Sequence, residues 1–175
     1  VSMSCFGTLT GDHEWEALTV AEAFSRWGTM RLEDALDSGR FDWVIAIDIE
    51  PHLGQHSPTF LFDYPAECAS LARLKKEDSD VAERFELYID GMELANGFSE
   101  LTDGDEQRAR FAEELRLIDN NKGGEARMPE RFLEDLERID RAAGIDFGLY
   151  RLLMMLKSAS NIDEVVSFSP DEYLE

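Results

Sequence analysis

The stretch RFELYIDGMELANGFSELTD, residues 84–103, places acidic and amide side chains among apolar ones. Two strand-like runs flank Asp90-Gly91, a pair that favours the two-residue turn of a β-hairpin. Because side chains alternate along a strand, one face of this hairpin is predicted to carry Glu86, Tyr88, Glu93 and Ala95. The pattern therefore predicts a hairpin on which Glu86 and Glu93 are diagonal neighbours.

The pair Asn96-Gly97 readily adopts positive φ, and a bulge there would bring Glu100 to the side of Glu93. Carboxylates that lie close together repel one another unless a cation or an ammonium group neutralises them. Mg²⁺ is held in proteins by one or two carboxylates together with substrate phosphates. The alternative is a solvated sheet face, since exposed carboxylates are common. The spacing alone leaves both interpretations open.

The apolar spacing predicts further elements around the hairpin. Helical patterns cover residues 18–28, 31–39, 103–120, 128–144 and 151–158, and strand-like runs cover residues 58–65 and 144–150. Thr19 is the expected N-cap of the first helix, and the helix over 151–158 is expected to be buried. Residues 42–50 fit either a β-branched strand or a helix that ends before Pro51. Helices against one antiparallel sheet define the fold class as α+β.

Length and charge exclude several classes of protein. The 175 residues fit a single domain, and 38 acidic against 17 basic residues give a net charge of −21. This charge opposes binding to nucleic acid or to anionic lipid, so tRNA is not an expected partner. The two cysteines lack metal-site or disulfide spacing. With no apolar run of membrane-spanning length and no signal peptide, the expected location is the cytoplasm.

These residues resemble the class II lysyl-tRNA synthetase group. RFELYIDGMELANGFSELTDGDEQRARF is similar to the catalytic hairpin and the helix that follows it, and PTFLFDYPAECASLARL is similar to the preceding strand and loop. Within the group, the chain is more similar to the elongation factor P lysine ligases. The similarity lies in IEPHLG, shortly before PTFLFDYPA, and in MPERFLEDLERI followed by AGIDFGLYRLLMM, which resembles the family's helix leading into motif 3. The resemblance covers residues 17–168. It implies an antiparallel sheet flanked by helices, with a mainly helical insertion in 1–57 that includes a helix over 42–50, and with the sheet core and motif 3 in 58–175.

The resemblance also implies roles on the nucleotide side. Glu86 and Glu93 match the glutamates that hold Mg²⁺ and the ATP phosphates. Arg151 matches the motif 3 arginine that stacks on adenine and contacts the phosphates, and Gly148 lies in the same motif. A planar guanidinium suits that task, because it can both stack and form paired hydrogen bonds. Glu93 and Arg151 are therefore the expected catalytic residues, with ATP and Mg²⁺ as cofactors.

On the amino-acid side, Asn96 matches an asparagine near the substrate, and Glu100 matches the acid that receives the lysine side-chain ammonium. Gly144 and Asp146 fall at pocket positions of motif 3. Asp146 stands where the family carries a small residue, and Tyr150 stands where it carries an acidic one. An added carboxylate fills volume and can attract a second ammonium, so the selected amino acid is expected to depart from the family pattern.

The implied reaction joins a lysine or β-lysine type amino acid, through its adenylate, to a lysine of elongation factor P. Two alternatives are a catalytic fragment of a lysyl-tRNA synthetase and a non-catalytic paralogue that acts as a binding protein. Motifs 1 and 2 of the family have no counterpart, so the chain resembles the C-terminal part of a catalytic domain with an exposed apolar sheet edge. The expected complement is an N-terminal half, or a second copy in a homodimer that uses this edge.

Overall fold

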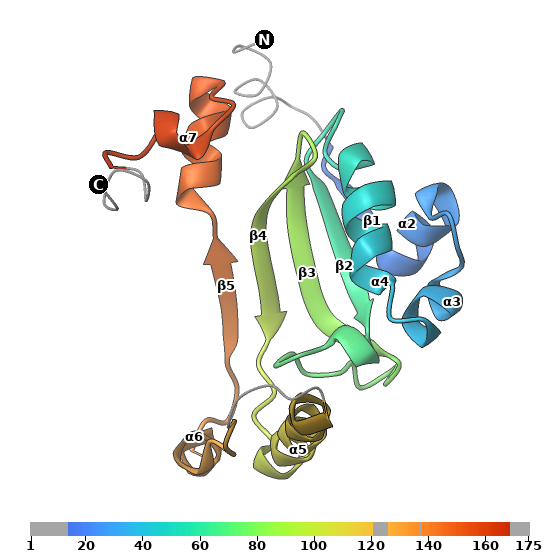
Figure 1. Ribbon diagram of the computed structural model, residues 1–175, viewed down its shortest axis with the longest axis vertical. Coiled ribbons are helices and arrows are strands. Elements are labelled where there is room, and N and C mark those ends of the chain that lie inside the picture. Colours follow the sequence, from blue (N-terminus) through green and yellow to red (C-terminus); the bar gives the residue numbers. More distant parts are fainter. Residues whose placement is uncertain (1–13, 121–125, 137, 169–175) are drawn as a thin grey trace. The chain divides into compact units, whose positions relative to one another are not determined.

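A computed structural model describes residues 14–120, 126–136 and 138–168, with five strands in the order β1-β2-β3-β4-β5 (Figure 1). The contacts divide the chain into two compact units. The first comprises Val1–Asp63, Phe85–Gly97 and Ile145–Glu175, and the second comprises Tyr64–Arg84 and Phe98–Gly144. The α+β class expected from the sequence is confirmed, whereas the single domain over 1–175 stays a prediction.

The first unit contains a short strand that the apolar spacing does not predict. β1 (Glu16–Thr19) pairs in parallel with β2 (Thr59–Pro65), which places Glu16 opposite Thr59. Thr19 also caps α2 (Val20–Trp27), since its hydroxyl accepts the Glu22 N–H at 3.1 Å and the Glu22 carboxylate accepts the Thr19 N–H at 2.9 Å. The predicted N-cap is confirmed, and the strand ends where the helix begins.

Residues 42–50 are helical. The chain passes from α3 (Leu32–Asp37) through α4 (Phe41–Val44) into a π-helical stretch, η1 (Ile45–Ile49), and a 3₁₀ turn, η2 (Glu50–His52). Four buried side chains follow helical spacing, namely Phe41, Val44, Ile45 and Ile49. Ile47, which the strand interpretation would align with them, is exposed. Figure 1 shows these helices grouped beside β1 and β2.

The predicted hairpin is confirmed. β3 (Val81–Ile89) and β4 (Met92–Ser99) are joined by Asp90 and Gly91, whose φ angles are 54° and 72°. Positive φ at both central residues is the geometry that matches the twist of the flanking strands. β5 (Ala143–Phe147) lies beside β4, and the N–H of Gly148 just after it donates to the carbonyl of Leu94 at 2.8 Å.

One apolar cluster holds the first unit's part of the hairpin to α7 (Leu149–Lys157). Its buried members are Leu87, Ile89, Leu94, Ala95 and Met155. The prediction that Ala95 shares the face of Glu86 is therefore wrong. Leu94 and Ala95 both enter the cluster, so the side-chain alternation shifts between these two residues, one position before the bulge expected at Asn96-Gly97.

Residues 151–157 are helical, as predicted, but the prediction that this helix is buried is wrong for one face of α7. Met155 is buried and Leu152 packs beside it, whereas Leu149 is 65% exposed and Leu153 is 40% exposed. Only one side of the helix meets the apolar cluster, so its other apolar side remains in solvent. Ile145 on β5 is also exposed, which gives the chain the apolar edge expected from its sequence.

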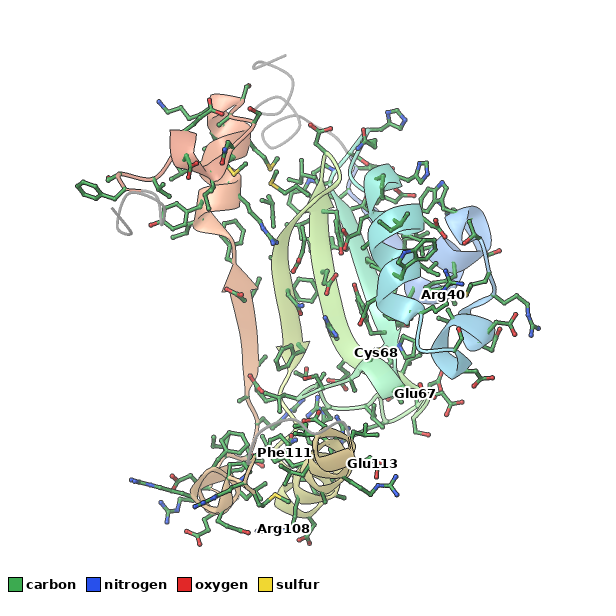
Figure 2. The ribbon with its side chains drawn as sticks, viewed as in Figure 1. Arg40, Glu67, Cys68, Arg108, Phe111 and Glu113 are labelled. Atoms are coloured by element: carbon green, nitrogen blue, oxygen red, sulfur yellow. The ribbon has the colours of Figure 1, made fainter. Side chains whose placement is uncertain are left out.

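The second unit contains the acidic helices. α5 (Gly104–Asn120) contacts α6 (Glu130–Leu136) through the rings of Phe111 and Phe132, 6.0 Å apart, and through an ion pair between Arg108 and Glu130. Figure 2 shows Phe111 and Arg108 on α5. A short 3₁₀ turn, η3 (Ala66–Cys68), precedes a small cluster of buried alanines. Across the described ranges, no helix has both the length and the apolar character needed to cross a membrane.

Gly54 brings the segment after η2 into backbone contact with the hairpin. The N–H groups of Asp90 and Gly91 donate to the carbonyls of Gly54 and Leu53 at 2.9 and 2.8 Å. Gly54 has φ +71°, and a Cβ there would lie 2.6 Å from both Ile89 Cα and the Tyr88 carbonyl oxygen. A side chain would thus meet backbone atoms, which cannot move aside independently.

We predict that Gly54→Ala destabilises the fold more than Gly39→Ala. Both glycines have positive φ, but a Cβ at Gly39 would meet nothing within 4 Å. Gly39→Ala should therefore cost only the backbone strain, about 1 kcal/mol in the free energy of unfolding. Gly54→Ala adds a clash and should cost about 2 kcal/mol more. Equal denaturant midpoints for the two variants would contradict the close packing.

Candidate functional site

The candidate site centres on the carboxylate of Glu86, in the first unit. Glu86 is only 7% exposed. Its Oε2 accepts the Tyr88 hydroxyl at 2.6 Å, and its Oε1 accepts the Asn96 Nδ2–H at 3.0 Å. The solvated-face interpretation is wrong for this residue, because a buried carboxylate is tolerated only with such donors. Two strands thereby fix the orientation of one acidic group.

Arg151 and Glu93 are in direct contact. The Nη1 group of Arg151 donates to the backbone carbonyl of Glu93 at 2.8 Å and to its carboxylate Oε2 at 3.1 Å. Gly148 makes room for this arginine, since a Cβ there would lie 3.1 Å from Arg151 Cδ. The structure thus brings together two residues that lie 58 positions apart in the sequence.

Glu50 belongs to the same group of charges, although the sequence pattern predicts no role for it. Its Oε1 lies 3.2 Å from the Tyr88 hydroxyl. Burial raises the pKa of Glu50, and repulsion by Glu86 and Glu93 raises it further, against the lowering effects of the Tyr88 hydrogen bond and of Arg151. Glu50 lies within IEPHLG, one of the stretches that carry the family resemblance. No local feature of that stretch indicates that this turn contacts the hairpin.

Asn96 carries an unsatisfied acceptor. A carboxylate can only accept hydrogen bonds, so the nitrogen of the amide faces Glu86 and the oxygen points elsewhere. That Oδ1 atom is buried and has no hydrogen-bond partner among the described residues. Asp146 lies on β5, the strand beside β4, which carries Asn96.

Glu100 and Gly144 lie in the second unit, where they meet each other. The Glu100 N–H donates to the Ala142 carbonyl at 3.0 Å, and a Cβ on Gly144 would lie 3.0 Å from Glu100 Oε1. Glycine at position 144 therefore leaves space for the Glu100 carboxylate. The expectation that Glu100 joins the face of Glu86 and Glu93 stays a prediction.

The residues present fit Mg²⁺ only together with a ligand. Among the described residues, no group of three or more His, Cys, Asp or Glu side chains is arranged to hold a metal ion. Mg²⁺ does not require such a group, because one or two carboxylates and the oxygens of a phosphate substrate suffice. Glu86 and Glu93 stay the predicted pair for this role.

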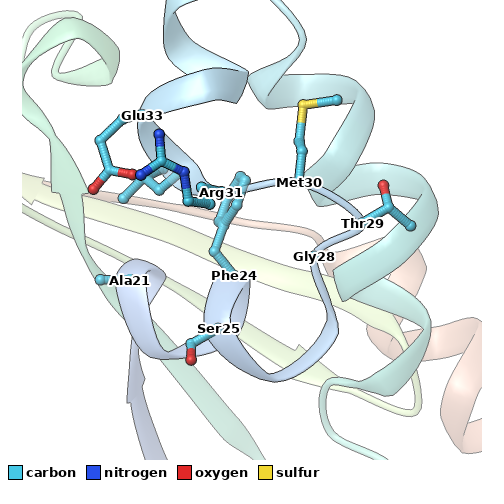
Figure 3. Close-up of a pocket in the computed structure, with 9 residues that line it drawn as sticks. Ala21, Phe24, Ser25, Gly28, Thr29, Met30, Arg31 and Glu33 are labelled. Carbon is cyan, nitrogen blue, oxygen red and sulfur yellow. The ribbon is translucent and has the colours of Figure 1, made fainter.

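A separate hollow lies among the N-terminal helices. It has a volume of about 510 Å³ and is lined by α2 and residues 28–33 (Figure 3). None of the residues predicted for the site lines it. Arg31 at its rim is already paired with Asp34, with 2.9 Å between Nε and Oδ2. The chemistry of the hairpin face therefore does not extend into this hollow.

Comparison with known proteins shows what the chain is similar to. The family described as tRNA synthetases class II (D, K and N) matches residues 6–172. A protein of Edwardsiella ictaluri named elongation factor P--(R)-beta-lysine ligase is 44% identical over 134 residues, which cover 73% of this chain and 40% of that protein. A protein of Pectobacterium carotovorum with the same name is 41% identical over 138 residues, covering 78% and 42%. The chain spans about two fifths of the length of these relatives.

We predict that Glu50 makes stability fall as the pH rises. Its pKa in the folded state lies above the ordinary value of 4.5, so its contribution is fully present below that value and is lost as the pH passes the folded pKa. Glu50→Gln removes this titration. The unfolding free energy of the wild type relative to Glu50→Gln should decline over that window in denaturant titrations. A difference that is flat or rises with pH would contradict the assignment.

Proposed function

The chain belongs to the class II tRNA synthetase family of the D, K and N type, and from this premise we propose that it activates a lysine-type amino acid with ATP and Mg²⁺. The activated amino acid would then pass to a lysine of elongation factor P, the acceptor in the name of its relatives. The observation that carries the proposal is the contact of Arg151 with Glu93 on the face where Glu86 is buried and fixed.

On the nucleotide side, Glu86 and Glu93 would hold Mg²⁺ and the phosphates, and Arg151 would stack on adenine. Bound Mg²⁺ would neutralise phosphate charge and raise the electrophilicity of the α-phosphorus. The chain's contribution is placement. Tyr88 and Asn96 orient Glu86, and the Glu93 carbonyl and carboxylate orient Arg151. Preorganised charges of this kind lower a barrier because they need no rearrangement during the reaction.

On the amino-acid side, the buried Oδ1 of Asn96 has no donor among the described residues, and Asp146 lies on the neighbouring strand β5. An ammonium group has three N–H donors, so it can satisfy such an acceptor and pair with a carboxylate. We assign the amino group of the substrate to these two residues. Glu100, with the space that Gly144 leaves, would receive the side-chain ammonium.

The proposed reaction has two steps. A carboxylate oxygen of the amino acid attacks the α-phosphorus of ATP, the α–β phosphoanhydride bond breaks, and pyrophosphate leaves. The ε-amine of the acceptor lysine then attacks the adenylate carbonyl, an amide bond forms, and AMP leaves with the bonding pair. Neither step needs a nucleophilic side chain of this chain, so positioning and charge neutralisation are sufficient.

A complement from outside residues 1–175 is part of the proposal. The relatives have more than twice the length that this chain covers, and large apolar side chains of β5 and α7 are exposed. A preceding half, or a second copy of the chain, would cover them. A cytoplasmic location belongs to the same proposal, because ATP is available there.

Two other functions make different predictions. A lysyl-tRNA synthetase fragment would charge tRNA once its remaining parts are supplied, although a net charge of −21 opposes tRNA binding. A non-catalytic paralogue would bind MgATP much more weakly than its relatives. Tyr150, which is 54% exposed and replaces an acidic residue of the family, is the observation in favour of the latter. Calorimetry with ATP and Mg²⁺ separates the two functions.

We predict amino-acid-dependent exchange of pyrophosphate into ATP, with lysine or β-lysine. It should be measured on this chain alone and on the chain fused to the part of the Edwardsiella ictaluri relative that the match does not cover. Glu93→Gln should lower the exchange rate by about 100-fold, because it removes a carboxylate from Mg²⁺ and from Arg151.

The matched control is Glu114→Gln, which removes the same charge from an exposed position of α5. Its exchange rate should equal that of the unaltered protein. An absence of exchange in both forms of the protein would end the ligase proposal. Equal losses in Glu93→Gln and Glu114→Gln would show that net charge, and not the site, governs the rate.

A further inference from the structure

The Tyr88 hydroxyl lies between two carboxylates. Tyr88 is fully buried, with its oxygen 2.6 Å from Glu86 Oε2 and 3.2 Å from Glu50 Oε1. A phenol carries one proton, so it can donate to only one of these groups at a time. The shorter distance assigns the proton to Glu86. The hydroxyl therefore acts chiefly on the carboxylate that is proposed to bind Mg²⁺.

The position of Glu50 is fixed by packing of the backbone. Glu50 begins the η2 turn, and the backbone carbonyls of Leu53 and Gly54 just after it accept two backbone N–H groups of the hairpin turn. The close approach of Gly54 to Tyr88 and Ile89 leaves no room for the segment to shift toward the strand. Glu50 is thus held against Tyr88 by contacts independent of its own charge.

The charges around this group are unbalanced. Glu50 is repelled by Glu86 and by Glu93, and Arg151, which contacts Glu93, is the cation that attracts it. Glu50 therefore lies among carboxylates that repel it. A divalent cation would relieve this excess of negative charge, provided that Glu86 keeps its orientation when the cation arrives.

We propose that Tyr88, backed by Glu50, is a positioning residue that holds the Glu86 carboxylate for Mg²⁺-dependent ATP binding. The inference rests on the nucleotide site proposed above and adds two residues to it. Tyr88 touches neither nucleotide nor metal and acts through Glu86. Partners that orient a metal ligand in this way typically contribute ten- to a hundred-fold to metal affinity.

The test is Tyr88→Phe, which keeps the buried ring and removes the hydroxyl. Calorimetry should measure the apparent Kd for Mg²⁺ at saturating ATP, and the Kd for ATP in the presence of EDTA. Tyr88→Phe should raise the first by about ten-fold or more and leave the second within about two-fold. The matched control is Tyr64→Phe, another buried tyrosine, whose ring lies under Arg84 in the second unit. It should change neither value.

The outcomes separate this inference from the proposed function. If the unaltered protein binds no MgATP, both are overturned. If the unaltered protein binds MgATP and Tyr88→Phe has the same Kd for Mg²⁺, only the positioning role is overturned. The positioning role is also overturned if Tyr88→Phe raises the Kd for Mg²⁺ and the Kd for ATP equally, because an equal rise indicates a general structural defect. Should Tyr88→Phe fail to fold, Glu50→Gln carries the test: an unchanged Kd for Mg²⁺ overturns the inference, and a several-fold increase supports it.

Discussion

Repulsion between carboxylates on one face of the β3–β4 hairpin is the constraint on which the site depends. Glu50, Glu86 and Glu93 come from two segments of the first unit, and Glu86 and Glu93 raise the electrostatic cost of ionising Glu50. The protein offsets this cost with specific donors. The Tyr88 hydroxyl and the Asn96 amide serve Glu86, and the Arg151 guanidinium serves Glu93. What remains is a negatively charged face that the proposed metal-bound nucleotide would neutralise.

The backbone keeps this face rigid. Positive φ at Asp90 and Gly91 closes the hairpin in two residues. The absence of a side chain at Gly54 allows the backbone of the segment after η2 to contact the backbone of the hairpin. On the opposite side, the apolar cluster of Leu87, Leu94 and Met155 ties the strands to α7, which carries Arg151. One helix therefore anchors the fold through Met155 and serves the site through Arg151. The acidic groups cannot relax apart without loss of this packing.

The sequence predicts those features that depend on local chemistry. The Asp90-Gly91 turn, the Thr19 cap and the position of Glu86 beside Tyr88 follow from turn preference, capping and strand alternation. Features that depend on tertiary contacts are not predictable in this way. Glu50 meets Tyr88 across 38 positions, and β1 is a strand only because β2 pairs with it. Leu94 and Ala95 both pack in the apolar cluster, which the alternation of side chains along a strand does not predict.

We propose that Glu86 and Glu93 together receive a nucleotide-bound divalent cation. Crystals of the protein with ATP and Mn²⁺, which also prefers oxygen ligands and scatters anomalously, test it most directly. We predict one anomalous peak at direct coordination distance, about 2.1 Å, from carboxylate oxygens of both residues and from ATP phosphates. Mn²⁺ and ATP bound away from both glutamates would contradict it.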